Sequence, residues 1–313
     1  FTALSQQKPW NKATWKIFPL PPKLSGYAFN QTSIPFELLV GKVDLIHSSD
    51  WSQPSASAKI VTTVHDLVFK KYPETVDPLI LTTQIKRLKK IVSSETHVIA
   101  DSTSTKNDLM EIYNLKSSLI DVVYPGIDRK YSPASNQEIE RVKTKYHLPD
   151  QYILSLGKQE PRKNIQRLVE ACATLEIPLV LTGKSGWGNQ IGKTHSHVIS
   201  TGYVDDSDLP ALYSGATVFV YPSLYEGFGF PVIEAMACGT PVVTSNLSSL
   251  PEIAGESAIL INPMDTESIR AGIITAIESR KVLVERGLSQ AKKYNWERAA
   301  QQVLQVYEKL IAK

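Results

Sequence analysis

The stretch VFVYPSLYEGFGFPVIEAMACGTPVVT, residues 218–244, decides the fold of the second half of the chain. A short apolar run is followed by a glycine-containing turn, an apolar segment and a second short apolar run. Pro231 suits the first turn of a helix, and Gly239 with a proline two residues later is typical of a helix end. The stretch therefore predicts a strand, a helix and a strand at Val218–Tyr221, Pro231–Cys238 and Val242–Thr244.

The same alternation of strands and helices fills the rest of the chain. In this half it predicts strands at Tyr152–Leu156, Leu179–Thr182, near Val198 and at Ala258–Ile261, and helices at Asn164–Leu175 and Leu209–Ser214. An earlier series predicts strands at Val43–His47, Ile60–Val64, His97–Ala100 and Ile120–Val123, and helices at Thr82–Val92 and Ser102–Tyr113. Polar residues 127–150 read as a linker between the two series. We therefore expect an α/β protein with two doubly wound, Rossmann-like parallel-sheet domains.

Length and composition exclude several classes of protein. The 313 residues suit two domains, and the apolar fraction of 42% is ordinary for a soluble globular chain. A net charge of +3, without a basic segment rich in aromatics, argues against a nucleic-acid partner. Cys172 and Cys238 lie in apolar helical patterns and indicate buried thiols in a reducing compartment. No apolar run approaches the ~20 residues of a membrane-spanning helix. From the two thiols we expect a cytoplasmic protein.

Glycines, cations and carboxylates follow successive predicted strands of the second half. In an open parallel sheet, ligands bind beyond the carboxyl ends of the strands. The segments found there are 157–164 (GKQEPRKN), 183–188 (GKSGWG), 202–204 (GYV) and 226–229 (EGFG). One such segment alone is most often a plain turn. Four together indicate a single polar crevice lined by glycine.

The two glutamates around the last of these turns suit a polyhydroxyl ligand. Gly227 and Gly229 let the backbone approach a ligand closely, and the helix that follows presents free N–H groups to anions. Carboxylates such as Glu226 and Glu234 accept hydrogen bonds in pairs, which suits vicinal hydroxyls. Cations for a phosphate come from the first segment: Lys158, Arg162 and Lys163. The sequence therefore predicts a cradle for a sugar nucleotide.

At these residues the chain resembles family 4 of the retaining glycosyltransferases, which have the GT-B fold. The strongest part of the resemblance is EGFGFPVIEAMACGTPVV, the Glu-x7-Glu element of the family. Agreement in order and spacing extends to GKQEPRKN, LVLTGKSGW, GYVDDSDLPALY and the earlier TVHDLVF. The resemblance runs from about Val61 to the C-terminus and implies two Rossmann-like domains that face a central cleft.

The resemblance also implies domain limits. An acceptor-side domain would take residues 1–130, with the C-terminal helix 297–313 packing back on it. A donor-binding domain would take residues 131–296. The chain opens at Phe1 without a methionine, and residues 1–36 show no clear first strand. We therefore expect the N-terminal domain to be incomplete.

The resemblance assigns a role to each matching residue. The expected catalytic residues are His65, Lys158, Lys163 and Glu226. The expected donor-binding residues are Gly157, Arg162, Gly183, Lys184, Tyr203, Val204, Leu209, Gly227, Phe228, Gly229 and Glu234. Glu226 and the turn backbone would hold the donor sugar, Glu234 the ribose, and the cations the diphosphate. The segments at 183–184 and 203–204 would wall the base, and His65 would lie in the first domain near the acceptor.

The expected mechanism follows from charge. Cleavage of the glycosidic bond places negative charge on the leaving diphosphate, and fixed cations stabilise that charge. The resemblance implies retention by front-face attack, with the departing phosphate accepting the proton of the acceptor. Asp206-Ser-Asp208 looks like an Asp-x-Asp metal motif, but N-capping of the helix at Leu209–Ser214 explains it. We therefore expect neither a metal nor another cofactor.

Two features of the first half allow a structural interpretation as well as a functional one. A histidine at a strand end, such as His65, is most often structural, but the His-Asp-Leu match favours function. The basic stretch Lys86, Arg87, Lys89 and Lys90 is usually a solvated helix face. The alternative is docking to anionic lipids at the inner membrane face, which would serve a lipid-linked acceptor.

The sequence therefore predicts an enzyme that moves a hexose from a UDP- or GDP-linked donor to a saccharide or lipid-linked saccharide. The EPRKN form of the loop is common among mannosyltransferase-like members and favours a mannose donor. Two alternatives stay open. One is a catalytically impaired sugar-nucleotide-binding protein of the same fold, because the usual first strand and glycine-rich loop are not found. The other is a sugar-nucleotide epimerase, which would turn over without an acceptor.

Overall fold

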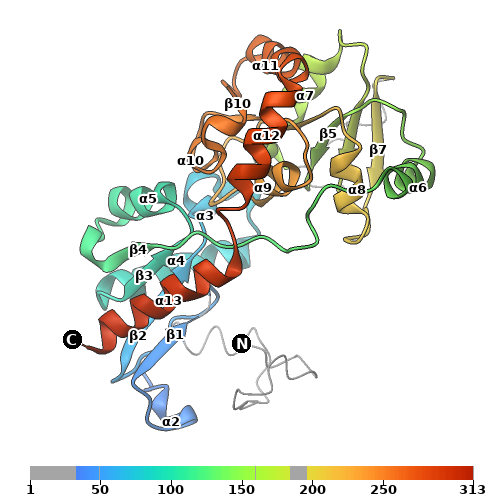
Figure 1. The fold of residues 1–313 in the computed structure, drawn as a ribbon. Helices are drawn as coiled ribbons and strands as arrows, with labels where there is room; N and C mark the ends of the chain where they lie inside the picture. The colour runs from blue at the N-terminus through green and yellow to red at the C-terminus, as the bar shows by residue number, and fades with distance from the viewer. Residues whose placement is uncertain (1–32, 49, 159, 184–195, 313) are drawn as a thin grey trace. The chain divides into compact units, whose positions relative to one another are not determined.

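The computed structural model describes residues 33–48, 50–158, 160–183 and 196–312. The chain divides into two compact units, each built on a parallel sheet (Figure 1). Unit 1 extends to Asp101 and adds Thr105–Val123 and Gln301–Lys313, and unit 2 comprises Ser102–Ser104 and Tyr124–Ala300. The prediction of two Rossmann-like parallel-sheet units is confirmed.

The described part of unit 1 contains a four-stranded parallel sheet in the order β1-β2-β3-β4. The strands are β1 (Leu45–Ser48), β2 (Lys59–Val64), β3 (His97–Ala100) and β4 (Ile120–Val122). The helices are α2 (Glu37–Val40), α3 (Val68–Lys71), α4 (Pro78–Ser93) and α5 (Thr103–Tyr113). Apolar side chains of α4 and α5 pack on β2 and β3 to form the core. Because Val64 pairs with Ala100 in the register, the next residues, His65 and Asp101, leave the sheet as neighbours.

In the described residues of unit 2, six parallel strands lie in the order β10-β9-β8-β5-β6-β7. They are β5 (Ile153–Leu156), β6 (Leu179–Thr182), β7 (Val198–Gly202), β8 (Val218–Tyr221), β9 (Val242–Ser245) and β10 (Ile259–Ile261). From β5 the chain builds outward in one direction to β7 and then returns to β8 on the other side. The switch point between β5 and β8 is where open parallel sheets bind ligands.

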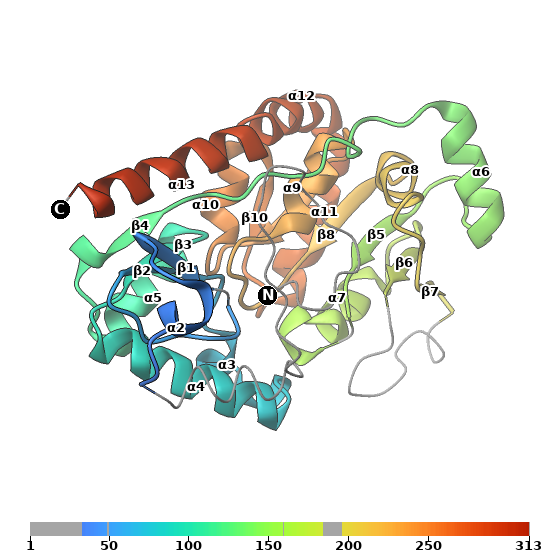
Figure 2. The same ribbon diagram turned by 90° about the horizontal axis from the view of Figure 1, so that it is seen from below.

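Helices cover both faces of the unit 2 sheet. They are α6 (Asn136–Tyr146), α7 (Ile165–Cys172), α8 (Leu209–Ser214), α9 (Phe230–Ala237), α10 (Leu250–Ala254), α11 (Thr266–Glu278) and α12 (Arg280–Ala291). Successive strand residues point to opposite faces, so Leu154 and Phe219 pack with α8 and α9. Ile153 and Val218 pack with α7 and α11. Figure 2 shows α8 and α9 on one side of this sheet and α7 on the other.

Helix α13 (Trp296–Ile311) begins in unit 2 and continues into unit 1. In its later part the Tyr307 hydroxyl lies 2.5 Å from His47 Nδ1, and Lys309 Nζ lies 2.9 Å from Asp121 Oδ2. Leu304 is 54% exposed, and Val306 is buried. The inward stripe of the helix therefore includes Val306 and not Leu304.

The basic stretch on α4 is not a solvated face throughout, because Arg87 is fully buried. Its Nη1 lies 2.8 Å from Asp50 Oδ1, and its Nη2 donates to Thr62 Oγ1 at 2.8 Å and to the Thr63 carbonyl at 2.7 Å. Helix α4 also begins earlier than predicted, since the Asp77 carboxylate caps its first turn. The sequence interpretation of Arg87 as part of a basic surface was wrong.

The interpretation of Asp206 and Ser207 as helix caps was also wrong. Asp208 occupies the N-cap position of α8, and its side chain makes no capping hydrogen bond. Its carboxylate lies 2.7 Å from both Arg141 Nη2 and Lys145 Nζ. Burial would raise the pKa of Asp208, but hydrogen bonds from these cations and a tyrosine outweigh it and lower the pKa to about 2. This segment joins α8 to α6 through ion pairs.

Candidate functional site

The loops that follow β5 and β8 meet at the switch point of unit 2. The Arg162 carbonyl accepts hydrogen bonds from the Leu224 N–H at 2.9 Å and the Ser223 hydroxyl at 3.2 Å. In return, Arg162 Nη1 donates to the Tyr225 carbonyl at 2.6 Å. Asn164 stands at the N-cap position of the next helix, but its side chain donates to the Pro263 carbonyl at 2.6 Å and makes no capping bond. These contacts hold the two loops together as a base for charged side chains.

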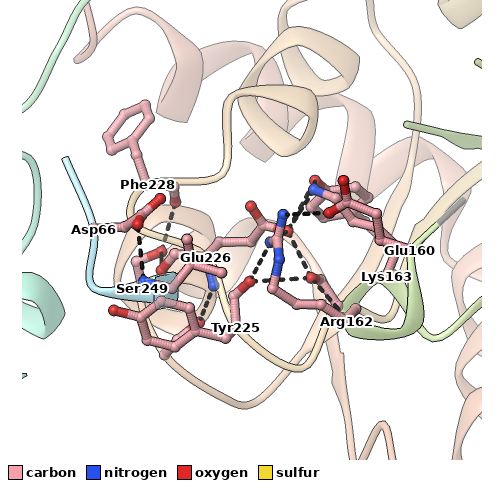
Figure 3. A network of polar contacts seen from close by, with 12 residues as sticks. Asp66, Glu160, Arg162, Lys163, Tyr225, Glu226, Phe228 and Ser249 are labelled. Atoms are coloured by element: carbon pink, nitrogen blue, oxygen red, sulfur yellow. Dashed lines mark hydrogen bonds and ion pairs between the residues drawn. The ribbon is translucent and has the colours of Figure 1, made fainter. Parts of the chain in front are cut away.

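Glu226 lies at the centre of a polar cluster between these loops (Figure 3). Its Oε1 accepts from Lys163 Nζ at 2.7 Å and the Ser223 hydroxyl at 2.6 Å, and lies 2.8 Å from Arg162 Nη1. The Tyr221 hydroxyl donates to the same oxygen at 3.0 Å. Burial alone would raise the pKa of Glu226, but the charges of Lys163 and Arg162 outweigh it and lower the pKa. The carboxylate is therefore ionised at neutral pH.

All of these contacts fall on one oxygen of the carboxylate. In the described residues Glu226 Oε2 has no protein partner, and the side chain keeps 12% of its surface exposed. A carboxylate oxygen in this state can accept a hydrogen bond from a ligand hydroxyl. Protein groups therefore hold Oε1, whereas Oε2 is available to a ligand.

The cations of the loop after β5 are paired but not neutralised. Burial lowers the pKa of Lys163, with Glu226 opposing that shift. Burial acts in the same direction on Arg162, but the attraction of Glu226 outweighs it and raises the pKa. Lys158 is 47% exposed and lies 3.1 Å from Glu160. Glu160 also lies 3.5 Å from Arg162, and both are labelled in Figure 3. Three cations share two carboxylates, so positive charge remains for an anion.

Glycines shape the edge of the sheet at β5, β6 and β7. The Gly157 N–H donates to the Thr182 carbonyl at 2.9 Å, and the Gly183 N–H donates to the Gly202 carbonyl at 2.8 Å. Gly183 has φ +135°, and a Cβ there would lie 2.4 Å from the Gly157 oxygen. A Cβ on Gly157 would lie 3.7 Å from Lys163 Cε, so the lysine stem passes directly over bare backbone. This edge is open to a ligand because it lacks side chains.

Two serines fix the turn at residues 226–229. The Ser248 hydroxyl accepts from the Glu226 N–H at 3.0 Å, and the Ser249 hydroxyl donates to the Glu226 and Phe228 carbonyls at 2.9 and 2.8 Å. The Phe228 ring packs in the core, 5.5 Å from the Tyr294 ring. Phe228 can therefore contact a donor through its backbone alone. Gly227 and Gly229 are buried, and Gly229 begins α9 with φ +108°.

Glu234 lies in a neighbouring cluster on α9. Its Oε2 accepts from the Tyr213 hydroxyl at 3.0 Å. Burial raises the pKa of Glu234, against hydrogen bonds from Tyr213 and Tyr131. The Tyr221 hydroxyl bonds to Glu226 alone of the two glutamates. Burial is the main reason that the pKa of Tyr221 is raised, and the negative charges of Glu226 and Glu234 raise it further.

The remaining predicted donor-binding residues differ in how deeply they are buried. Tyr203 is 60% exposed, whereas Val204 is buried in the core. Leu209 is partly buried and packs against the same core. Lys184 lies outside the described residues.

In unit 1, His65 follows β2 and is held by Asp101, which follows β3. Its Nδ1 lies 2.7 Å from Asp101 Oδ2, and its side chain is 57% exposed. This hydrogen bond is the main reason that the pKa of His65 rises to about 9. In the described part of the chain no hydrogen bond is made to Nε2. His65 is therefore a cation with a free N–H at neutral pH.

Several residues of these clusters were missed by sequence reasoning. Tyr221 and Tyr213 read as core aromatics, and nothing in the sequence distinguishes a buried phenol that holds a carboxylate. Asp101 could have been found, because it follows the predicted strand His97–Ala100 as His65 follows its own strand. Among the described residues no cluster of three or more potential side-chain ligands is suited to a metal. In the same part of the chain no helix has the length and apolar character to span a membrane.

Comparisons with known proteins place this geometry in a family. The family model "Glycosyl transferases group 1" matches residues 136–306, and "Glycosyltransferase Family 4" matches residues 7–131. The chain is 34% identical over 283 residues to the O-antigen chain mannosyltransferase B of Escherichia coli, which covers 85% of this chain and 74% of that protein.

Two solved structures show a similar fold. One is a sucrose-phosphate synthase from Thermosynechococcus elongatus, with a TM-score of 0.71 at 25% identity, covering 88% of this chain and 76% of that one. The other is HepE of Anabaena in complex with UDP and glucose, with a TM-score of 0.71 at 20% identity, covering 90% and 85%. The second likeness concerns the fold alone.

Proposed function

We propose that this chain, which belongs to family 4 of the glycosyltransferases, transfers a hexose from a nucleotide-diphosphate sugar to a saccharide with retention of configuration. One observation carries the proposal. At the switch point of the unit 2 sheet, Arg162 Nη1 and Lys163 Nζ lie 2.8 and 2.7 Å from the same oxygen of Glu226. Cations for a diphosphate and an acid for a sugar hydroxyl are thus held in one place.

The cations are proposed to act on the leaving group. In the reaction the bond between the anomeric carbon and the diphosphate oxygen breaks, and the acceptor oxygen forms its bond on the same face. The proton of the acceptor hydroxyl passes to the departing phosphate. Lys163 and Arg162 would stabilise the charge that grows on that phosphate, which lowers the barrier because the charge is larger in the transition state than in the donor. No metal is proposed for this role.

The acids are proposed to hold the donor. Glu226 Oε2, without a partner in the described residues, would accept a hydroxyl of the sugar. Glu234, with one oxygen held by Tyr213, would accept the ribose hydroxyls. The name of the relative at 34% identity, a mannosyltransferase of O-antigen chains, favours mannose as the sugar and polysaccharide synthesis as the setting. UDP and GDP are both proposed as carriers.

The acceptor is proposed to be a saccharide or a lipid-linked saccharide met in the cytoplasm. A membrane contact through α4 receives less support than the sequence suggested. With Arg87 buried, Lys86 and Lys89 remain exposed on that stretch. At about 1 kcal/mol for each basic residue near an anionic surface, two lysines do not hold a protein on a membrane without further contacts.

A binding panel tests the proposal. UDP, GDP, ADP, UDP-glucose and GDP-mannose are titrated by calorimetry into the protein in the presence of EDTA. We expect at least one to bind, and Glu234→Ala to weaken that binding roughly tenfold through the loss of hydrogen bonds to a charged group. Glu278→Ala, an exposed glutamate on α11, is the matched control and should change nothing. If no nucleotide binds the unaltered chain, the proposed donor site is wrong.

A further inference from the structure

The Tyr221 hydroxyl occupies an unusual place at the end of β8. Its ring is 2% exposed, so the phenol is removed from water. The hydroxyl accepts a short hydrogen bond from Lys163 Nζ and donates to Glu226 Oε1 at 3.0 Å. Lys163 also contacts Glu226 Oε1 directly at 2.7 Å. The three groups therefore form a closed triangle of hydrogen bonds.

The ring of Tyr221 also supports the ammonium. Lys163 Nζ lies 4.8 Å from the ring centroid, at a distance where a cation is attracted to an aromatic face. The Lys163 side chain is 12% exposed, and burial works against its charge. A phenol that offers both an oxygen and a ring face offsets part of that penalty.

We propose that Tyr221 is a positioning residue of the donor site, whose hydroxyl fixes Lys163 against Glu226 Oε1 and so leaves Glu226 Oε2 as the oxygen available to a sugar hydroxyl. The role of Tyr221 in the reaction rests on the proposed function. Its role in positioning Lys163 rests only on the triangle of hydrogen bonds. Without the triangle, a tyrosine at the end of a core strand would be interpreted as a residue of the hydrophobic core.

Charged groups from each neighbouring element act on the triangle. The loop after β5 supplies Arg162 and Glu160, the turn after β8 supplies Glu226, and α9 supplies Glu234. Glu226 opposes the loss of the Lys163 proton, whereas Arg162 favours it. Removal of the phenol oxygen takes away a neutral acceptor of the ammonium and leaves these charges unchanged. Lys163 should then lose its proton at a lower pH.

Tyr221→Phe tests this, because it removes one oxygen and keeps the ring. The control is Tyr152→Phe, which removes another buried hydroxyl of the same unit. That hydroxyl donates to the Leu212 carbonyl at 2.7 Å, and Tyr152 immediately precedes β5, at the end of the strand opposite to the site. Both variants should lose a similar amount of thermal stability. The two variants should differ in the titration of Lys163 and in the affinity for nucleotides.

The first measurement needs no ligand. The lysine side chains are labelled with carbon-13, the Lys163 signal is assigned with Lys163→Arg, and its titration is followed by NMR. We expect Tyr221→Phe to move the Lys163 titration to lower pH by about one unit, and Tyr152→Phe to leave it in place. Equal Lys163 titrations in Tyr221→Phe and the unaltered chain would overturn the proposal.

The second measurement connects the triangle to the ligand. UDP and GDP are titrated by calorimetry at pH 7.5 with EDTA, and Tyr221→Phe should bind roughly tenfold more weakly, as expected when a hydrogen bond to a charged group is lost. Unchanged affinity in Tyr221→Phe would limit Tyr221 to packing and overturn its role at the donor site. If neither nucleotide binds the unaltered chain, the proposed function fails, while the NMR titration still decides whether Tyr221 holds Lys163.

Discussion

The carboxyl edges of the two sheets are built from the same kind of parallel strand but hold their charges differently. In unit 2, Glu226 Oε1 is surrounded by Lys163, Arg162, Ser223 and Tyr221, all within 3.0 Å. In the described part of unit 1, His65 forms its one ion pair with Asp101, and its side chain is 57% exposed. The first edge is organised before any ligand arrives, whereas the second keeps a charged group in water.

This difference suits the two chemical tasks that we propose. A group that stabilises charge in a transition state is most effective when it is already fixed and dry, because it then needs no reorganisation. A group that meets a variable saccharide gains from remaining accessible. The unit 2 edge fits the first task and the unit 1 edge fits the second. Substitutions at the two edges should therefore differ in kind as well as in size.

The largest effect is expected for Lys163→Met. The substitution keeps the length of the stem and removes a mostly buried charge that is proposed to face the diphosphate, so the transfer rate should fall roughly 10²–10³-fold. Lys158→Met is the matched control on the same loop. Lys158 is 47% exposed and pairs with Glu160, so its loss should cost far less. The measurement is kcat and KM with the donor found in the binding panel. Equal losses in both variants would contradict the idea that burial makes the unit 2 cations effective.

The next effect concerns the stability of the glycine edge. In Gly183→Ala the new methyl group would lie 2.4 Å from the Gly157 oxygen, at φ +135°. We expect the free energy of unfolding to fall by about 2–4 kcal/mol, from strain and overpacking together. Gly202→Ala is the control, since φ is +69° and nothing lies within 4 Å of its added Cβ. Gly202→Ala should lower the free energy of unfolding by about 1–2 kcal/mol. Urea denaturation of both variants measures the difference, and a smaller loss for Gly183→Ala would show that this edge is not as tightly packed as the geometry implies.

The strands and the glycine segments could be predicted from the sequence because each leaves a local signal. Short apolar runs bounded by glycine gave most strands within a residue or two of their observed ends, as at Val218–Tyr221 and His97–Ala100. The rule that ligands bind at strand ends then brought Glu226 together with Lys163 before the sheet order was known. Helices α11 and α12 were not identified, and α4 began earlier than its apolar pattern suggested.

The pairing inside the site could not be predicted, because it depends on which strands are neighbours. The sequence does not show that β8 returns to lie beside β5, which brings Tyr221 and Ser223 to the same oxygen as Lys163. Burial of a charge is equally hidden. Arg87 looks like its exposed neighbours Lys86 and Lys89, and only the position of Asp50 across the fold explains why it lies inside.

The smallest effect is expected for Asp101→Asn in unit 1. The carboxylate is the main cause of the raised pKa of His65, about 9, so the variant should return that pKa toward its ordinary value near 6.5. Because the folded pKa is raised, the stabilisation from the protonated imidazole is fully present below pH 6.5 and is lost as the pH rises through 9. At pH 8 the unaltered chain should therefore keep a charged His65, whereas Asp101→Asn should not.

NMR titration of the His65 ring measures this, with the His47 ring as an internal reference, since burial lowers its pKa instead. Transfer activity should follow the same shift if the imidazolium N–H contacts the acceptor: the alkaline limb of the pH profile moves to lower pH in Asp101→Asn, while donor affinity in unit 2 stays constant. A profile that does not move, in a variant whose His65 has become neutral, would assign His65 to structure. The functional contrast between the two edges would then be lost, because His65 is the one residue of the described part of unit 1 that is proposed to act on a substrate.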